Sequence, residues 1–462
     1  MESATHCPVE RLRLREALRL IQRAFVFEVG SSPRKGVRLS GCELSNRDSA
    51  SSGMQTLHPR KPRLAVVSPF IDKSHGTERM VIEWIDRLAA TFEIHIYTQR
   101  ATDIDPTRFV LHNIPKLPGP HLFNFLWWFI ANHWWRRRDA RSKNLQFDLV
   151  YSPGTNCLDA DAVTVHIVFA EFVRRVRREL RFSRSRVRLW PRILHRRLYY
   201  RTIMFFERRV FLNCRTKIIL TASKTAEELR RHFGNTQTLP VIPAGIDHQV
   251  FNPTTRCRLR HNARRSLGLE ADHFVLLLIG NDWHNKGLRT LLDALSQLSD
   301  LPLDLLVVGR DDPATFIHAI QERALEKSVR FLPPRKDVEF YYAAADAYAG
   351  PSLEDTFALP ALEAMGCGLP VIISVRAGAA AVVTHGSDGL ILDGPTDARE
   401  LAGVIRSLCE DPLLGQRLGR NAVATASQYS WDHSARKLAV VFDEILRSKR
   451  KTRRSDVPGP IL

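Results

Sequence analysis

The sequence predicts an α/β protein made of two tandem Rossmann-like domains, each a doubly wound parallel sheet, with both sheets facing a central cleft. Three observations lead to this prediction. The chain has 462 residues, more than one hydrophobic core usually serves. Short apolar strands alternate with stretches of helical periodicity, and they do so in two successive series. Open parallel sheets bind ligands at the carboxyl ends of their strands, so two in tandem would share one cleft.

The first series begins at "RLAVVSP" (63–69), a buried strand that we expect to be followed by a helix over 77–90 and the strand "EIHIYT" (93–98). Short apolar segments that end in loops are typical of parallel strands covered on both faces. The further strands expected here are "FDLVYS" (147–152), "DAVTVHIV" (161–168), "KIILTAS" (217–223) and "TLPVIPAG" (238–245).

The second series follows a polar stretch near 252–272 and repeats the same alternation. Its expected strands are "HFVLLLIG" (273–280), "PLDLLVVG" (302–309), "VRFLP" (329–333), "AYAGPS" (347–352) and "LPVIIS" (369–374). The helices between them are expected over 288–298, 314–324, 338–345 and 360–365.

The composition is that of a globular protein, with 44% hydrophobic and 25% charged residues. No apolar run is long enough to span a bilayer. The seven cysteines (7, 42, 157, 214, 257, 367 and 409) follow neither Cys-x-x-Cys nor metal-ligand spacing, and the N-terminal stretch does not have the form of a signal peptide. These features predict a cytoplasmic protein with free thiols and no structural zinc.

Positive charge is concentrated in one segment of a chain whose net charge is +19. Residues 171–217 hold sixteen Lys and Arg against three Glu, a net charge of +13. Such a segment attracts nucleic acid, anionic lipid head groups or a phosphorylated substrate, unless it is only a solvated helix surface. The aromatic stretch "LFNFLWWFIANHWWRRR" (122–138) is either a core helix or a helix that lies on a membrane.

The two ends of the chain differ from its centre. Residues 1–58 join a basic, Leu-bearing stretch to a Ser/Gly/Arg-rich segment, a composition that favours a flexible extension. We expect the two Rossmann-like domains over 59–245 and 246–430, a terminal helix over 431–447 that packs back on the N-terminal domain, and a basic tail over 448–462.

The segment "PSLEDTFALPALEAMGCGLPV" (351–371) places three acids beside a buried strand. Glu354 and Asp355 follow the strand "AYAGPS", and Pro360 is a good first residue for the next helix. The loop amides and the free N–H groups of that helix can hold an anion such as a diphosphate. Glu363, one turn inside the helix, can accept hydrogen bonds from the two hydroxyls of a ribose. The alternative is that these acids are ordinary solvated surface residues.

In this context the sequence resembles glycosyltransferase family 4, which has the GT-B fold and carries an acid and a Glu at this spacing. The resemblance runs over 63–446. It includes "SPFIDKSHGTERM" (68–80) with Gly76, "VTVHIVF" (163–169) with His166, and "GNDWHNKG" (280–287) with Asn281 and Lys286. The segments "VIPAGIDHQVFNP" (241–253) and "SQYSWDHSARKL" (427–438) match the domain crossing and the terminal helix.

The spacing identifies which acid corresponds to the family's first one. Asp355 lies eight residues before Glu363, whereas Glu354 lies nine before it, so Asp355 fits the pattern. Ala358 stands where the family has Gly, and Asn281 stands where it often has Arg. Lys286 would then be the main cation on the diphosphate, with Arg310 or Arg335 as substitutes for the missing Arg.

The resemblance implies a retaining, metal-independent transfer of a sugar from a nucleotide-sugar donor. It assigns Lys286 and Asp355 to catalysis together with His166, which would orient a hydroxyl of the donor sugar. Donor binding is assigned to Gly76, Asn281, Lys286, Asp355, Phe357, Ala358, Leu359 and Glu363. No cofactor and no metal are expected. Asp311 and Asp312 could bind a metal, but paired acids after a strand more often cap a loop and a helix.

The function expected is therefore glycosyl transfer to a hydroxyl of a glycan or lipid-linked acceptor, in polysaccharide or glycolipid assembly. Both the basic and the aromatic segment precede the domain crossing, in the half to which the resemblance assigns acceptor binding, so we expect peripheral contact with the cytoplasmic face of an anionic membrane. An oxidoreductase is disfavoured because neither first loop contains G-x-G-x-x-G. The alternatives are a non-catalytic nucleotide-sugar-binding protein and a basic nucleic-acid-binding protein, although no nucleic-acid partner is expected.

Overall fold

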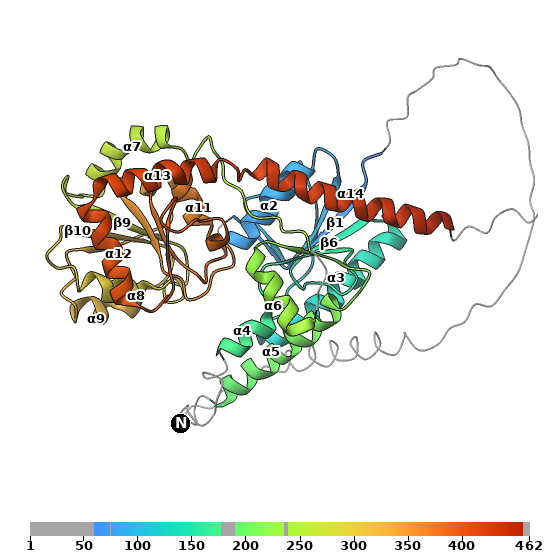
Figure 1. Ribbon diagram of the computed structural model, residues 1–462. Helices are drawn as coiled ribbons and strands as arrows, with labels where there is room; N and C mark the ends of the chain where they lie inside the picture. Colours follow the sequence, from blue (N-terminus) through green and yellow to red (C-terminus); the bar gives the residue numbers. More distant parts are fainter. Residues whose placement is uncertain (1–59, 74, 177–189, 235–238, 456–462) are drawn as a thin grey trace, which may run out of the picture. The chain divides into compact units, whose positions relative to one another are not determined.

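The computed structural model describes residues 60–73, 75–176, 190–234 and 239–455 (Figure 1). The chain divides into two units, Met1–Arg60 and Lys61–Leu462. The second unit contains both sheets and is the one described below. The expected extension over 1–58 and the end of the expected basic tail, 456–462, lie outside the described residues.

The first sheet of this unit is parallel throughout, with the strand order β5-β3-β1-β6-β7-β8. Leu64 of the central strand β1 is in register with Ile94 of β3 and Leu149 of β6. The strands are β1 (Arg63–Val67), β3 (Glu93–Thr98), β5 (Val110–Asn113), β6 (Leu149–Pro153), β7 (Ala162–Val165) and β8 (Lys217–Leu220). Beside them lies the small pair β2 (Phe70–Ile71) and β4 (Arg100–Ala101).

The second sheet is also parallel, with the order β11-β10-β9-β12-β13-β14. Its strands are β9 (Phe274–Ile279), β10 (Leu303–Val308), β11 (Val329–Leu332), β12 (Ala347–Gly350), β13 (Val371–Ser374) and β14 (Leu390–Leu392). The strand order reverses direction between β9 and β12. The loops that follow these two strands are therefore neighbours at the switch point, the usual ligand position in such a sheet.

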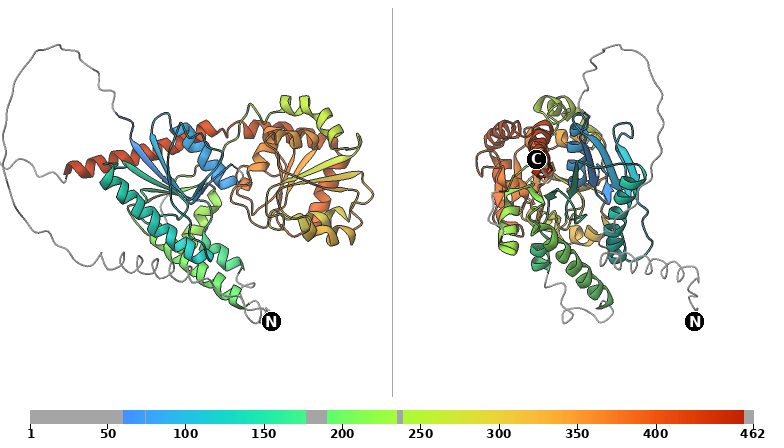
Figure 2. Two further views of the ribbon diagram at one scale, coloured as in Figure 1. Left: turned by 180° about the vertical axis from the view of Figure 1, so that it is seen from behind. Right: turned by 90° about the vertical axis from the view of Figure 1, so that its right-hand side faces the viewer.

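Helices cover both faces of each sheet (Figures 1 and 2). In β1, Leu64 and Val66 join one core cluster while Ala65 and Val67 join another, as the alternation of a strand covered on both faces requires. The helices of the first half are α2 (Gly76–Leu88), α3 (His121–Ser142), α4 (Phe169–Val176), α5 (Trp190–Phe211) and α6 (Ser223–Phe233). Those of the second half are α7 (Pro253–Ser266), α8 (Leu288–Leu295), α9 (Ala314–Gln321), α10 (Glu339–Ala344), α11 (Leu359–Gly366), η3 (Gly378–Ala381), α12 (Ala398–Glu410) and α13 (Pro412–Ala426).

One predicted strand is not confirmed, and one helix was not predicted. The expected strand 238–245 is not found, because its described residues, 239–245, form only the isolated bridge between Leu220 and Val241. Pro240 and Pro243 flank that bridge and supply no N–H group to a ladder. The polar stretch after the crossing, for which no element was predicted, contains α7, which Asn252 caps by accepting from the Thr255 N–H and which has Pro253 in its first turn.

The polar helix α7 is held in place by arginines rather than by an apolar face. Arg256, Arg260 and Arg264 recur every four residues and donate to backbone carbonyls at the end of α10, and Arg260 and Arg264 also bind Asp346. Cations favour the carbonyl end of a helix, so this arrangement satisfies the last turn of α10. A search for hydrophobic periodicity cannot detect such a helix.

The terminal helix α14 (Trp431–Ser455) continues past residue 447 and packs on the first half. The Trp84 indole N–H of α2 donates to the Ser434 hydroxyl at 2.7 Å, with both side chains buried. Phe442 packs against Phe92 and Tyr151, at ring-centroid distances of 6.0 and 5.3 Å. The chain thus returns from the second half to bury its last helix against the first.

Candidate functional site

The acid loop, residues 351–358, joins β12 to α11 as the sequence predicted. Ala358, the residue before the helix, has φ +67° and ψ +59°, a left-handed conformation that costs an Ala about 1–2 kcal/mol and a Gly nothing. Its N–H donates to Asp355 Oδ1 at 3.1 Å. This backbone conformation favours Gly, the residue that the resemblance implies at this position.

Asp355 pairs with Lys286, which comes from the neighbouring loop at the switch point. The Lys286 ammonium binds Asp355 Oδ2, and both side chains are mostly buried. Glu354 takes a different partner, since its Oε1 lies 2.5 Å from Lys224 Nζ of α6, and Lys224 also donates to the Arg376 carbonyl at 2.8 Å. The two adjacent acids therefore have separate surroundings, and the one selected by spacing is the one beside the predicted lysine.

The lysine loop, residues 280–287, is fastened to the acid loop by Asn285. The Leu353 N–H donates to the Asn285 carbonyl, and the Asn285 amide donates to the Glu354 carbonyl, both at 2.7 Å. Gly287 has φ +82°, and a Cβ there would lie 2.1 Å from the Pro351 carbonyl oxygen. Only Gly permits this approach, so Gly287 and Asn285 set the position of Lys286 relative to Asp355.

A second glycine fixes the other side of the acid loop. A Cβ on Gly378 would lie 2.0 Å from the Thr356 carbonyl oxygen, and the Gly378 N–H donates to the Asp355 carbonyl at 3.1 Å. The Asp355 N–H in turn donates to the Arg376 carbonyl at 3.3 Å. The loop is thus held on both sides by backbone contacts that sequence reasoning did not identify.

Glu363 is buried and has partners on both carboxylate oxygens. Its Oε1 lies 2.7 Å from Arg79 Nη1, and its Oε2 accepts from the Tyr342 hydroxyl at 2.7 Å. Arg79 belongs to α2 of the first half, and the charge of Glu363 raises the pKa of its guanidinium. A carboxylate offers about four lone-pair positions, so Glu363 retains capacity for hydroxyl donors beside these two bonds.

Gly76 begins α2 and lies close to α11. A Cβ added to Gly76 would be 3.7 Å from a methyl carbon of Leu359, which is the first residue of α11. At this end of α11 Pro360 has no N–H and the Ala361 N–H donates to the Ala358 carbonyl at 2.9 Å, so the Leu359 N–H and the positive end of the helix dipole are what can face an anion. The structure therefore brings Gly76, Leu359, Asp355, Lys286 and Glu363 to one region, with Phe357 and Ala358 between them.

His166 lies at the carboxyl end of β7 and is buried. Its Nε2 is 3.3 Å from the Thr164 hydroxyl, and its Nδ1 has no hydrogen-bond partner within the described part of the chain. Burial lowers the pKa of His166 to about 4, so the imidazole is neutral at pH 7. A neutral ring with one open nitrogen can accept or donate one hydrogen bond, but it is a weak base.

Two predicted positions do not join the Lys286–Asp355 pair through any contact in the structure. The Asn281 side-chain oxygen accepts from the Arg310 N–H at 3.1 Å, which links the lysine loop to the loop after β10. Arg335, a suggested substitute cation, binds Asp337 at 2.7 Å and lies 4.2 Å from the Phe340 ring.

The acids Asp311 and Asp312 bond to backbone groups. Asp311 accepts from the Asp282 and Trp283 N–H groups at 3.0 and 2.6 Å, and Asp312 accepts from the Ala314 N–H at 2.9 Å. Within the described ranges, no group of three or more His, Cys, Asp or Glu could hold a metal ion. Asp311 thus stabilises the lysine loop and Asp312 the residues at the start of α9, the structural role that we gave as the alternative to metal binding.

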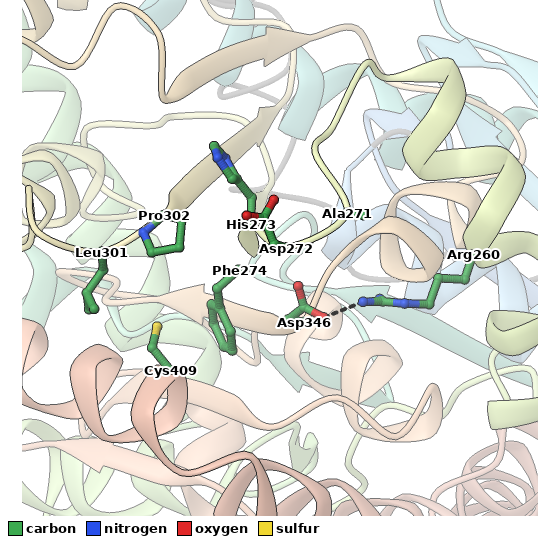
Figure 3. A pocket seen from close by; sticks show the side chains of 9 residues that line it. All are labelled: Arg260, Ala271, Asp272, His273, Phe274, Leu301, Pro302, Asp346 and Cys409. Carbon is green, nitrogen blue, oxygen red and sulfur yellow. Dashed lines mark hydrogen bonds and ion pairs between the residues drawn. The ribbon is translucent and has the colours of Figure 1, made fainter.

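Two cavities lie in the second half, on opposite edges of its sheet. One of about 260 Å³ lies at the amino ends of the strands (Figure 3), away from the Lys286–Asp355 pair; Arg260, His273, Asp346 and Cys409 are among its lining residues. The other, of about 450 Å³, borders the lysine loop and is lined by His284, Arg289, Asp311, Asp312, Thr315 and Phe316. In a parallel sheet the carboxyl edge is the functional one, which favours the second cavity as a neighbour of the site.

Two family models together match most of the chain: "Glycosyltransferase Family 4" over residues 74–250 and "Glycosyl transferases group 1" over residues 260–425. A similar curated protein is the D-inositol 3-phosphate glycosyltransferase of Corynebacterium urealyticum, 30% identical over 248 residues that cover 51% of this chain and 58% of the relative. The chain thus matches little more than half the length of that relative.

Solved structures with the same fold include WaaG, a glycosyltransferase involved in lipopolysaccharide biosynthesis, with a TM-score of 0.69, 21% identity, and coverage of 82% of this chain and 99% of that one. Another is HepE of Anabaena, solved in complex with UDP-glucose, with a TM-score of 0.62, 20% identity, and coverage of 83% and 99%. Their fold is GT-B, and the two Rossmann-like halves described above have the same architecture.

Proposed function

Because the chain belongs to glycosyltransferase family 4, we propose that it moves a sugar from a nucleotide-sugar donor to a hydroxyl of a glycan or lipid-linked acceptor, with retention of anomeric configuration. The observation that carries the proposal is the Lys286–Asp355 pair beside the start of α11, with Glu363 buried one turn further along. A cation, an acid and a helix N-terminus in one place suit a sugar joined to a diphosphate. HepE, which shares the fold, was solved with UDP-glucose.

In the proposed complex the diphosphate lies at the first turn of α11, between the Leu359 N–H and Lys286. Glu363 accepts hydrogen bonds from the ribose, and Asp355 accepts one from a hydroxyl of the sugar. In the protein without donor, Lys286 pairs with Asp355. In the proposed complex with donor, the Lys286 ammonium also faces the diphosphate. Its charge stabilises the phosphate as negative charge grows there during bond cleavage.

In the reaction the bond between the sugar's anomeric carbon and the diphosphate oxygen breaks. The acceptor oxygen bonds to the same face of that carbon, and its proton passes to the departing phosphate. Neutral His166 orients a sugar hydroxyl rather than removing the acceptor proton, which agrees with its low pKa. Positioning and electrostatics supply the rate enhancement, and we propose that no metal is needed.

For the acceptor we propose a glycan or a lipid-linked glycan at the cytoplasmic face of a membrane, bound by the first half of the unit. Two observations support this acceptor class: WaaG takes part in lipopolysaccharide biosynthesis, and the first half carries the basic segment. In the part of the chain that the structure describes, no helix is long and apolar enough to cross a bilayer.

The test is a thermal-shift screen of the full chain against UDP-, GDP-, ADP- and dTDP-sugars, followed by turnover with the donor that binds. A ligand that binds only the folded protein raises its melting temperature in proportion to the logarithm of concentration over Kd. We expect sugars of one nucleotide class to raise the melting temperature. With such a donor and an acceptor, the protein should release nucleoside diphosphate in the presence of EDTA. If turnover stops with EDTA and returns with Mg²⁺, the metal-free site is wrong. If no sugar nucleotide shifts the melting temperature, the donor assignment fails.

A further inference from the structure

Helix α5 carries apolar side chains on two opposite faces. The inward face packs on the domain through Ile193, Ile203, Val210 and Phe211, all of them buried. The outward face consists of side chains that are 43–60% exposed: Trp190, Leu194, Leu198, Phe205 and, directly after the helix, Leu212. A helix on the surface of a domain usually has one apolar face, which packs on the core. The second apolar face of α5 therefore suggests a binding surface.

The exposed side chains form a continuous stripe. At 100° per residue they fall within one sector of about 80° around the helix, opposite to the buried residues. Single exposed apolar residues are common on protein surfaces, but an aligned row of five is not. Figures 1 and 2 show α5 beside α3 and α4, and the aromatic contacts Phe129–Phe206 and Phe125–Tyr199 join its inner side to α3.

The charge on this helix is almost entirely of one sign. α5 contains six arginines: 192, 196, 197, 201, 208 and 209. Its single acid, Glu207, is buried and accepts from the Phe169 and Ala170 N–H groups at 2.7 and 3.1 Å, so it caps α4. Arg201 and Arg208 lie in the sector of the apolar stripe, and the Arg209 guanidinium lies 4.9 Å from the Phe205 ring. The outward face thus combines large apolar side chains with arginine and has no acid.

We propose that the outward face of α5 is the surface by which this protein lies on an anionic lipid bilayer. An aromatic and aliphatic row that enters the lipid boundary, flanked by arginines that meet head groups, is the arrangement such a surface requires. A nucleic acid would use the arginines but would not bury the exposed aliphatic side chains of this face, such as Leu194 and Leu198. A second copy of the same face would bring two sets of arginines together.

The proposed surface lies on α5 and not on the aromatic stretch 122–138, which was one of the two segments that suggested a membrane contact. In α3 the residues Trp128, Phe129 and Arg136 are buried, and Arg136 binds Asp159 at 2.6 Å. One side of α3 therefore packs into the core, while Phe123 and Trp134 on the same helix are 54% and 53% exposed. Part of the basic segment, residues 177–189, lies outside the described residues, and the inference uses only α5 and Leu212.

The test compares two triple variants of the full chain by co-sedimentation with vesicles of phosphatidylcholine alone and of phosphatidylcholine with phosphatidylglycerol. The test variant is Leu194→Ser, Leu198→Ser and Phe205→Ser. The matched control, Ile317→Ser, Leu413→Ser and Val440→Ser, removes three side chains that are also 48–73% exposed but lie on other helices. We expect the test variant to partition at least tenfold less onto the anionic vesicles and the control to match wild type.

A second pair of variants tests the charge. Arg201→Ser with Arg208→Ser should weaken binding to the anionic vesicles by about fivefold per arginine and flatten its salt dependence, whereas Arg399→Ser with Arg420→Ser should have a small effect. Donor binding measured by thermal shift should survive in all four variants, so a failed donor assignment leaves this test intact. Equal pelleting of the two triple variants overturns the proposal. A change of oligomeric state in the test variant with unchanged vesicle binding, or RNA binding that the serine substitutions do not alter, also overturns it.

Discussion

Arg79 and Glu363 form an ion pair with 2.7 Å between Nη1 and Oε1, although they lie 284 positions apart in the sequence and belong to different halves of the unit. The Glu363 side chain is only 4% exposed, so the pair is largely shielded from water. The residue proposed to bind the ribose therefore also contacts the opposite half.

Glu363→Gln should weaken donor binding by more than tenfold, because a neutral amide accepts weaker hydrogen bonds than a carboxylate. It should also destabilise the fold by about 3–5 kcal/mol, since Arg79 loses its buried partner. Arg79→Lys, which keeps the charge, should cost less stability and leave donor affinity within a few-fold of wild type. Calorimetric titration and urea unfolding measure the two quantities; equal loss of affinity in both variants would mean that Glu363 acts only through the pair.

Lys286→Ala and Asp355→Asn should differ in which kinetic constant they change. Lys286→Ala removes the positive charge that is proposed to stabilise the leaving phosphate. We expect kcat to fall by at least a hundredfold, the effect of losing about 2.7 kcal/mol of electrostatic stabilisation. Asp355→Asn should lower kcat more than donor affinity, because in the proposed complex this acid contacts the sugar and not the nucleotide. Initial rates across donor concentrations separate the effects. Glu354→Gln is the adjacent control, and a kcat loss as large as that of Asp355→Asn would contradict the assignment by spacing.

Ala358→Gly should stabilise the protein by about 0.5–1 kcal/mol, since the left-handed conformation strains Ala and not Gly. The matched change Ala361→Gly, inside α11, should destabilise it by about 1 kcal/mol. Urea unfolding midpoints give both values. If Ala358→Gly instead destabilises the fold as much as Ala361→Gly does, the backbone at this position is not under strain.

Stability should fall on acidification from pH 6.5 towards pH 4, in part because of His166. Burial lowers the pKa of this imidazole from 6.5 to about 4, so within this window the unfolded chain binds a proton that the folded chain does not. Each unit of difference corresponds to about 1.4 kcal/mol. His166→Gln should make stability less dependent on pH between 6.5 and 4. Some dependence should remain, because burial also lowers the pKa of His112 to about 4. Parallel profiles for wild type and His166→Gln would contradict the neutral, buried state.

The sequence predicted the sheets and the acid loop because their signals are local. Alternating apolar segments mark β9 and β12, and the spacing from Asp355 to Glu363 follows from one loop and one helical turn. Lys286 was predicted through resemblance alone, and its place beside Asp355 came from the strand order, which no local pattern encodes.

The residues that sequence reasoning missed act through contacts between distant segments. Asn285 bridges two loops, Lys224 reaches Glu354 from the other half, and Gly378 is required by a carbonyl oxygen of a different segment. Gly378, followed by three alanines, was a weak sequence signal for a close backbone approach, whereas nothing around Lys224 distinguishes it from other surface lysines. Such residues become visible only when both partners are placed in space.

Helix α2 is fastened at several points along its length. Arg79 in its first turn contacts Glu363, while Trp84 and Arg87 further along bond to Ser434 and Asp432 at the start of α14. Arg79 and Trp84 lie on the same helix, so a displacement of α2 at its Glu363 end would also affect its contacts with α14. If the proposed ribose binding at Glu363 displaces Arg79, the hydrogen exchange of amide protons in the first turns of α14 should change when donor is added.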